Sequence, residues 1–134
     1  MAGYSGTPLV KKLGIGPGAA VHVIGEPPGL AEALEPLPTG VTFKKSLRGP
    51  LDVVLFFTTQ QRQLTNRWPA VTAAMTPAGA VWVGWPKKAS KVPTDITEDV
   101  LRTLLLPTGW VDVKVCAIDD TWSGLKFVLR KELR

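Results

Sequence analysis

The chain has 134 residues, of which 45% are hydrophobic and 20% are charged, and its formal net charge is +5. This length suits one domain, and the composition is that of a globular protein, which excludes a disordered tail, a collagen and a coiled coil. The single Cys116 excludes an intrachain disulfide and a cysteine zinc cluster, and the single His22 excludes a histidine-rich metal site. The chain has no apolar run of the roughly 20 residues that cross a bilayer. It has no secretory signal pattern at its N-terminus either, so we expect a cytoplasmic protein without a membrane partner.

Six short segments have the composition of β-strands. In chain order they are 20–25, 41–45, 51–57, 79–85, 111–118 and 125–130. The third segment is apolar at nearly every position, which is typical of a central parallel strand covered on both faces. Only six residues separate the last two segments, which favours a terminal β-hairpin.

The longest helical pattern follows the third strand. Its apolar stripe consists of Leu64, Trp68, Val71 and Met75. Thr58 and Gln61 precede the stripe at the spacing of a capping box. Pro69 lies inside the pattern and predicts a kink or two short helices.

Shorter helical patterns occur elsewhere in the chain. We expect short helices at 7–13 and 30–34, where helix-forming residues end at turn formers. A second capping pattern, Asp95 with Glu98, predicts the start of a helix that Pro107 closes. Helices therefore alternate with most of the predicted strands.

This alternation predicts one α/β domain over 1–134 with a mostly parallel sheet of about six strands. The terminal hairpin adds an antiparallel strand to that sheet. About six residues join the second and third strands, whereas a parallel crossover usually takes a dozen or more. Either this connection is a stretched loop or these two strands pair antiparallel.

The first strand, the loop Gly25-Glu26-Pro27-Pro28-Gly29 and the terminal hairpin together resemble a shortened S-adenosylmethionine-dependent methyltransferase fold of the Rossmann type. In that family the sheet has seven strands, and a Gly-x-Gly-x-Gly loop after the first strand passes under the cofactor. The resemblance makes Gly25 and Gly29 the outer glycines and places Pro27 at the middle one. Val23 and the pair Lys44-Lys45 stand where the family has acidic residues. A lysine cannot accept hydrogen bonds from ribose hydroxyls, so we expect neither productive S-adenosylmethionine binding nor another cofactor.

Nearly the whole chain also resembles an uncharacterised bacterial family, a domain of unknown function found mainly in actinobacteria. The matching stretches are AGYSGTPL at 2–9, KKLGI at 11–15, GPLDVV at 49–54, WPKKAS at 85–90, VDVKVCAID at 111–119 and TWSGLK at 121–126. That family has no established activity. The resemblance therefore implies a fold and no reaction.

Ligands of open α/β sheets bind at the carboxyl ends of the strands, and we predict a binding site there. The candidate ligand-binding residues are Gly25, Glu26, Gly29, Thr58, Thr59, Trp85, Lys87, Lys88 and Trp122. We expect two tryptophans and two lysines of this set to line one shallow cleft beside the glycine loop, where they would suit a flat anionic ligand. The alternative is that the glycines and prolines only form turns while the tryptophans cap the core. No catalytic or metal-ligating residue is predicted.

The charge is unevenly distributed, because residues 36–94 contain eight basic residues and one acidic residue, Asp52. This excess favours an anionic partner. The alternative is a solvated basic face that serves solubility, which the dispersal of the basic residues along the segment favours. Three hypotheses follow. The first is a non-catalytic Rossmann-like domain that binds a small anionic ligand or a partner protein. The second is an active methyltransferase with an unusual cofactor loop, and the third is a module that binds nucleic acid weakly and non-specifically.

Overall fold

The computed structural model describes residues 6–134, so residues 2–5 of the AGYSGTPL match lie outside the described part. The helices and strands are α1 (Leu9–Lys12), β1 (Ala20–Ile24), α2 (Leu30–Ala33), β2 (Thr42–Phe43), β3 (Leu51–Phe57), α3 (Gln61–Ala73), β4 (Met75–Pro86), α4 (Glu98–Leu105), β5 (Trp110–Ala117) and β6 (Trp122–Leu129). Three short 3-10 turns are η1 (Lys88–Ser90), η2 (Leu106–Thr108) and η3 (Lys131–Leu133). No helix within residues 6–134 is long and apolar enough to span a membrane.

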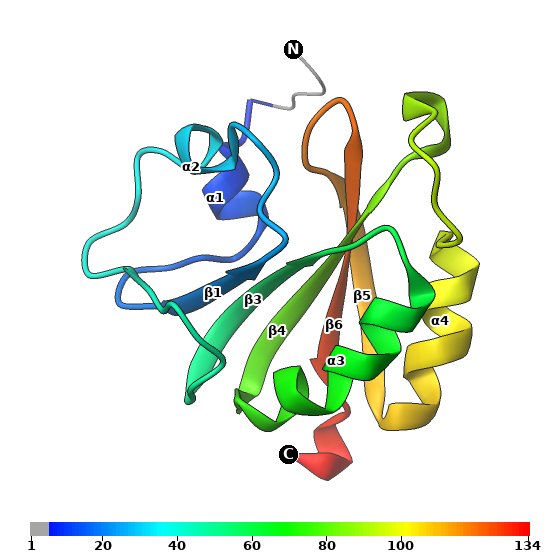
Figure 1. The fold of residues 1–134 in the computed structure, drawn as a ribbon. Helices are drawn as coiled ribbons and strands as arrows, with labels where there is room; N and C mark the ends of the chain where they lie inside the picture. Colours follow the sequence, from blue (N-terminus) through cyan, green and yellow to red (C-terminus); the bar gives the residue numbers. More distant parts are fainter. Residues whose placement is uncertain (1–5) are drawn as a thin grey trace.

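The strands form one six-stranded sheet in the order β2-β1-β3-β4-β6-β5 (Figure 1). Strands β2, β1, β3 and β4 are parallel, and β6 pairs antiparallel with both β4 and β5. Strand β5 therefore runs in the same direction as β4. The predicted α/β fold class, with a mostly parallel sheet and a terminal antiparallel hairpin, is confirmed.

The connection between β2 and β3 settles the alternatives left by the sequence. The two strands do not pair, because each pairs in parallel with β1, on opposite sides of it. Residues 44–50, called here the β2–β3 linker, form the stretched loop that crosses β1. The Nδ1–H of His22 on β1 donates to the Lys44 carbonyl oxygen at 2.7 Å and fixes the linker there. Strand β2 covers only 42–43, shorter than the predicted 41–45, because its register with β1 ends where Phe43 pairs with Val21.

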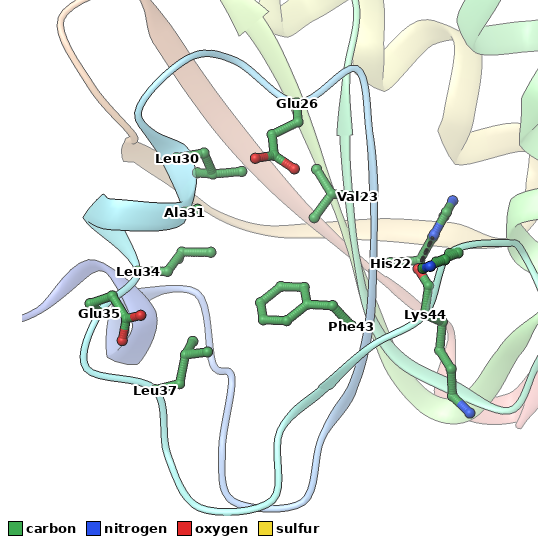
Figure 2. Close-up of a pocket in the computed structure, with 11 residues that line it drawn as sticks. His22, Val23, Glu26, Leu30, Ala31, Leu34, Glu35, Leu37, Phe43 and Lys44 are labelled. Atoms are coloured by element: carbon green, nitrogen blue, oxygen red, sulfur yellow. Dashed lines mark hydrogen bonds between the residues drawn. The ribbon is translucent and has the colours of Figure 1, made fainter.

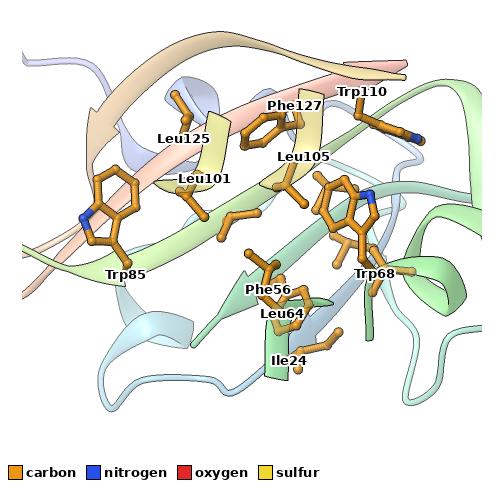
Figure 3. Packing of buried hydrophobic residues seen from close by; sticks show 14 of the residues in the cluster. Ile24, Phe56, Leu64, Trp68, Trp85, Leu101, Leu105, Trp110, Leu125 and Phe127 are labelled. Atoms are coloured by element: carbon orange, nitrogen blue, oxygen red, sulfur yellow. The ribbon is translucent and has the colours of Figure 1, made fainter. Parts of the chain in front are cut away.

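Helices cover both faces of the sheet, as Figure 1 shows: α3 and α4 on one face, α1 and α2 on the other. Side chains alternate between the two layers along β3, where Val54 and Phe56 face α3 and α4, and Leu55 and Phe57 face α1 and α2. Figure 3 shows the larger layer, in which aromatic and leucine side chains of β3, β4, β6, α3 and α4 interlock. Burial on both faces is the reason that β3 is apolar throughout.

Helix α3 differs from its prediction at both ends. It begins at Gln61, and the Thr58 side chain does not cap it. The Thr58 hydroxyl accepts from the Gln60 N–H, which lies before the helix, and donates to Gln63 Oε1 at 2.5 Å. The N–H of Gln61 instead donates to the Asp95 carboxylate at 2.8 Å. The helix runs unbroken past Pro69 to Ala73. Met75, predicted on its apolar stripe, opens strand β4, which is therefore longer than the predicted 79–85.

The cap of helix α4 is Thr97 and not the predicted Asp95. The Thr97 side chain accepts a hydrogen bond from the Val100 N–H at 3.1 Å. Asp95 lies too early in the chain for this role, and its carboxylate is engaged at the start of α3. The predicted helix at 7–13 is the single turn α1, Leu9–Lys12. The predicted terminal strands are β5 and β6, which together span Trp110–Ala117 and Trp122–Leu129.

Candidate functional site

A cavity of about 560 Å³ lies between α2 and the carboxyl ends of β1 and β2. This volume is typical of small-molecule sites. We call it the β1–β2 cavity. It is lined by His22, Val23, Glu26, Leu30, Ala31, Leu34, Glu35, Leu37, Phe43, Lys44 and Lys45.

The cavity exists because the elements around it are short. Helix α2 has 4 residues and strand β2 has 2, so neither fills the space beside β1. Leu34 and Val23 form an apolar wall, and the ring of Phe43 stands opposite the helix (Figure 2). Phe43 is 41% exposed and Leu37 is 36% exposed, so apolar surface is open to a ligand.

Opposite charges lie on the two sides of the cavity. Glu26 and Glu35 flank α2, and Lys44 and Lys45 follow β2. None of these four side chains is in an ion pair in residues 6–134. In Figure 2 the Glu26 carboxylate lies beside the apolar wall, and the Lys44 chain extends away from the Phe43 ring. The cavity can therefore take an apolar ring together with groups that pair with a carboxylate on one side and an ammonium on the other.

The loop between β1 and α2 requires a glycine at its start. Gly25 has a φ of 68°, and a Cβ there would overlap the carbonyl oxygen of Phe57 at the end of β3. Gly29 has a φ of 83° and begins α2, but a Cβ there would meet nothing. Pro27 and Pro28 have no N–H, so the loop offers few backbone donors to a ligand.

The predicted cleft of two tryptophans and two lysines does not form. Trp85 is 7% exposed and buried in the layer with α3 and α4. Trp122 packs in the opposite layer, with its ring edge-to-face against Phe57 at 5.4 Å between centroids. Their register explains this, because Trp85 pairs with Ser123 and Pro86 pairs with Trp122, so the two indoles point to opposite faces.

The two lysines lie by the β5–β6 turn. The Lys87 N–H donates to the Thr121 carbonyl at 2.8 Å, next to Trp122 in the chain, and the Lys88 side chain is exposed. Their part in binding a ligand stays a prediction.

Thr58 and Thr59 lie where loops close the sheet edge. Thr58 is buried and accepts a hydrogen bond from the Gln60 N–H. The Thr59 carbonyl accepts from the Thr94 hydroxyl at 2.7 Å and from the Asp95 N–H at 3.3 Å. The loops after β3 and β4 are thus tied together, whereas the edge over β1 and β2 is open.

Of the nine predicted site residues, Glu26 alone lines the β1–β2 cavity. Sequence reasoning missed its apolar wall and Phe43. The available signal was the group of leucines from Leu30 to Leu37, which Pro36 interrupts. This segment is too short for a helix that covers the sheet edge, so its leucines could have been predicted to line a cavity.

Comparisons with known proteins support the fold assignment. No protein-family model matches the chain, and no curated protein matches it, so the actinobacterial resemblance stays a prediction. Solved structures do match. N-methyltransferase NodS from Bradyrhizobium japonicum is 12% identical with a TM-score of 0.63, over 91% of this chain and 93% of that one. The chain has a methyltransferase-like Rossmann fold.

Two further structures of this fold are similar. A SAM-dependent methyltransferase from Aquifex aeolicus is 13% identical with a TM-score of 0.59, over 89% of this chain and 86% of that one. A Burkholderia thailandensis 1,6-didemethyltoxoflavin-N1-methyltransferase, whose structure contains S-adenosylhomocysteine, is 14% identical with a TM-score of 0.61, over 92% of this chain and 77% of that one. At such low identities the likeness concerns the fold alone.

Proposed function

We propose that this methyltransferase-like domain binds a small anionic ligand of the nucleotide class in the β1–β2 cavity and transfers no methyl group. The observation that carries the proposal is the cavity itself. It places an open aromatic ring, Phe43, between a carboxylate, Glu26, and the ammonium groups of Lys44 and Lys45, which form no ion pair with any residue of 6–134.

The chemistry of these groups matches a nucleoside monophosphate. A flat base packs on the Phe43 ring and the apolar wall. The Glu26 carboxylate accepts hydrogen bonds from sugar hydroxyls. The phosphate meets the ammonium groups of Lys44 and Lys45 at the rim, on the side away from Glu26 and Glu35.

The same groups disfavour S-adenosylmethionine. Lys44 and Lys45 bring positive charge to the end of β2, where a carboxylate would hold the ribose of S-adenosylmethionine. The cationic sulfonium of that ligand has no favourable charge interaction with these two lysines. Val23 contributes an apolar side chain in place of an acid. The Pro27-Pro28 pair removes two backbone donors from the loop.

Calorimetric titration tests the proposal. Adenosine and guanosine monophosphates are titrated beside S-adenosylmethionine and S-adenosylhomocysteine. We expect a saturable nucleotide site tighter than about 100 μM, equivalent to about −5.5 kcal/mol, and no saturation by S-adenosylmethionine at millimolar concentration.

Variants locate the site. Phe43→Ala and the double variant Lys44→Gln with Lys45→Gln should each weaken nucleotide binding about tenfold or more, about 1.4 kcal/mol. Lys87→Gln with Lys88→Gln removes the same charge elsewhere on the sheet edge and should leave the affinity unchanged. Equal losses in both double variants would show that only net charge matters and would contradict a site in the cavity.

Active methyl transfer is the second candidate function, and one observation favours it. Gly25 approaches β3 as closely as a glycine permits, beside the cavity, in a chain whose structural neighbours are methyltransferases. Saturable binding of S-adenosylmethionine below about 100 μM, with no nucleotide binding, would replace the first proposal by this one.

A further inference from the structure

A second cavity, of about 240 Å³, lies where strands β3 and β4 begin, away from the carboxyl ends of β1 and β2. We call it the β4 cavity, and the residues that decide its chemistry are Gly14, Asp52, Thr76, Ala80, Lys126 and Val128. None of the residues that line it also lines the β1–β2 cavity. Its volume is below the range of about 300–1,000 Å³ that is usual for drug-sized ligands, so it suits a molecule smaller than a nucleotide.

An irregular pairing between β3 and β4 opens this space. Between the pairs that Met75 and Ala80 form with β3, residues 76–79 of β4 stand opposite Asp52 alone. Extra residues of this kind bend a strand out of the regular sheet. The segment 76–79, called here the β4 bulge, therefore leaves the plane of the sheet and forms one wall of the cavity.

The floor of the β4 cavity is apolar and rigid. Val53, Ala80 and Val128 pair across β3, β4 and β6, so their side chains lie in one row on the same face of the sheet. Val53 and Ala80 are buried, and the fully buried Leu13 contributes a further apolar side chain to the lining. The small methyl group of Ala80 leaves room between the two valines for a short aliphatic chain.

Two polar side chains of the lining have no partner within residues 6–134. The Lys126 ammonium takes part in none of the ion pairs there, and its Nζ lies 3.9 Å from the position that a Cβ on Gly14 would take, at the rim of the cavity. The Thr76 hydroxyl has no hydrogen-bond partner there either. Its Oγ1 lies 2.9 Å from where a Cβ on Gly79 would be, so the glycine leaves room for the hydroxyl.

The positive charge of Lys126 is not compensated by its neighbours. Across β6 and β5 it stands opposite Lys114, and like charges in that arrangement are destabilising. On its other side it stands opposite the buried Trp82. Asp52 lines the same cavity, but its Oδ2 accepts the Ala20 N–H at 2.8 Å and it forms no ion pair with Lys126. The fold therefore holds an ammonium group at the cavity without a counter-ion from residues 6–134.

We propose that the β4 cavity binds a short-chain aliphatic monocarboxylate. The carboxylate pairs with the Lys126 ammonium, and the Thr76 hydroxyl is a further donor at the wall. The aliphatic chain lies over the apolar row around Ala80. A dianion such as phosphate is disfavoured, because it would have no use for the apolar floor and the negative charge of Asp52 would repel it.

An amide NMR titration of the wild-type chain with butyrate tests the proposal. We expect saturable shifts at Gly14, Ala78, Ala80 and Val128, with a dissociation constant of about 1 mM, which is within the affinity ceiling for a ligand of so few atoms. Butyramide has the same shape without the charge and should bind about tenfold more weakly or worse. Butylamine, which carries the opposite charge, and inorganic phosphate should give no saturable shifts at these residues.

Variants assign the binding to the two polar groups. Lys126→Gln should weaken butyrate binding about tenfold, and Thr76→Val, which keeps the shape of the side chain, about threefold. Lys114→Gln is the matched control, because it removes the same charge from the same row but does not line the cavity, and it should change the affinity by less than about twofold. If circular dichroism shows that Lys126→Gln is unfolded, Thr76→Val and butyramide decide the question.

Several results would overturn the proposal. These are the absence of saturable shifts at the cavity, butyramide or phosphate bound as tightly as butyrate, and equal losses in Lys114→Gln and Lys126→Gln. Neither Lys126 nor Thr76 lines the β1–β2 cavity, so both variants should bind nucleoside monophosphate as wild type does. Failure of carboxylate binding and failure of nucleotide binding are therefore distinguishable.

Discussion

Single residues of this domain show how local geometry fixes a residue type. Gly25 and Gly29 begin and end the same loop, and both have a positive φ. They differ in their surroundings, because a side chain at Gly25 would strike the Phe57 carbonyl whereas one at Gly29 would point into open space. The pair separates the cost of a left-handed backbone from the cost of a close approach.

We expect Gly25→Ala to destabilise the fold by about 3 kcal/mol, because strain at positive φ adds to displacement of the β3 backbone. Gly29→Ala should cost about 1 kcal/mol, since only the backbone strain applies. Urea denaturation followed by tryptophan fluorescence measures both. An equal loss in the free energy of unfolding of both variants would show that the close approach of Gly25 to the Phe57 carbonyl does not contribute to the destabilisation.

The thiol of Cys116 is the second test at this scale. Burial raises its pKa, and the nearby positive charges of Lys12 and Lys114 oppose this effect without overcoming it. The thiol should therefore stay protonated at neutral pH and react with iodoacetamide more slowly in the folded chain than in urea. The folded-state rate should rise only as the pH passes the ordinary thiol range. Faster reaction in the folded chain at the same pH would contradict this.

At the scale of elements, the start of helix α3 depends on a residue far away in the chain. The capping patterns of the sequence located both long helices but assigned the wrong caps. Thr58 turns to Gln63, and Asp95, which lies 34 residues beyond Gln61 in the chain, supplies the acceptor for α3. Local spacing reveals that a helix begins, but a cap supplied from a distant loop leaves no local signal.

Removing the Asp95 carboxylate should therefore weaken α3 and not α4. Asp95→Ala leaves the Gln61 N–H without its acceptor and should cost about 1 kcal/mol. Asp99→Ala is the matched control, because its carboxylate is 94% exposed, and it should barely move the denaturation midpoint. Amide hydrogen exchange at the first turn of α3 should quicken in the first variant alone. Unchanged exchange there would show that Asp95 is no cap.

At the scale of the whole molecule, the sequence predicts the architecture better than the site. The alternation of strands and helices and the terminal hairpin were enough to predict a mostly parallel sheet with one antiparallel strand. This works because the apolar pattern of each element reflects the layer in which it packs. The relative facing of Trp85 and Trp122 depends on the β4–β6 register, and a shift of one residue would reverse it. Such a register is set by the assembled sheet and cannot be read from separate segments.

The β1–β2 cavity escaped prediction for a related reason. It results from what α2 and β2 do not cover, and an uncovered surface has no motif of its own. Leu37 and Phe43 are large apolar residues of the kind that usually lie in a core, yet both side chains are exposed to solvent. Only the assembled fold shows that these side chains line a space with charged groups at its rim.

The most direct test of the proposed function is an amide NMR titration of the wild-type chain with adenosine monophosphate. The account predicts saturable shifts concentrated at Val23, Glu26, Leu34 and Phe43 around the cavity, with little change at Lys87 and Trp122. S-adenosylmethionine at the same concentrations should leave these signals in place. Saturable shifts at the cavity with S-adenosylmethionine and none with the nucleotide would contradict the account.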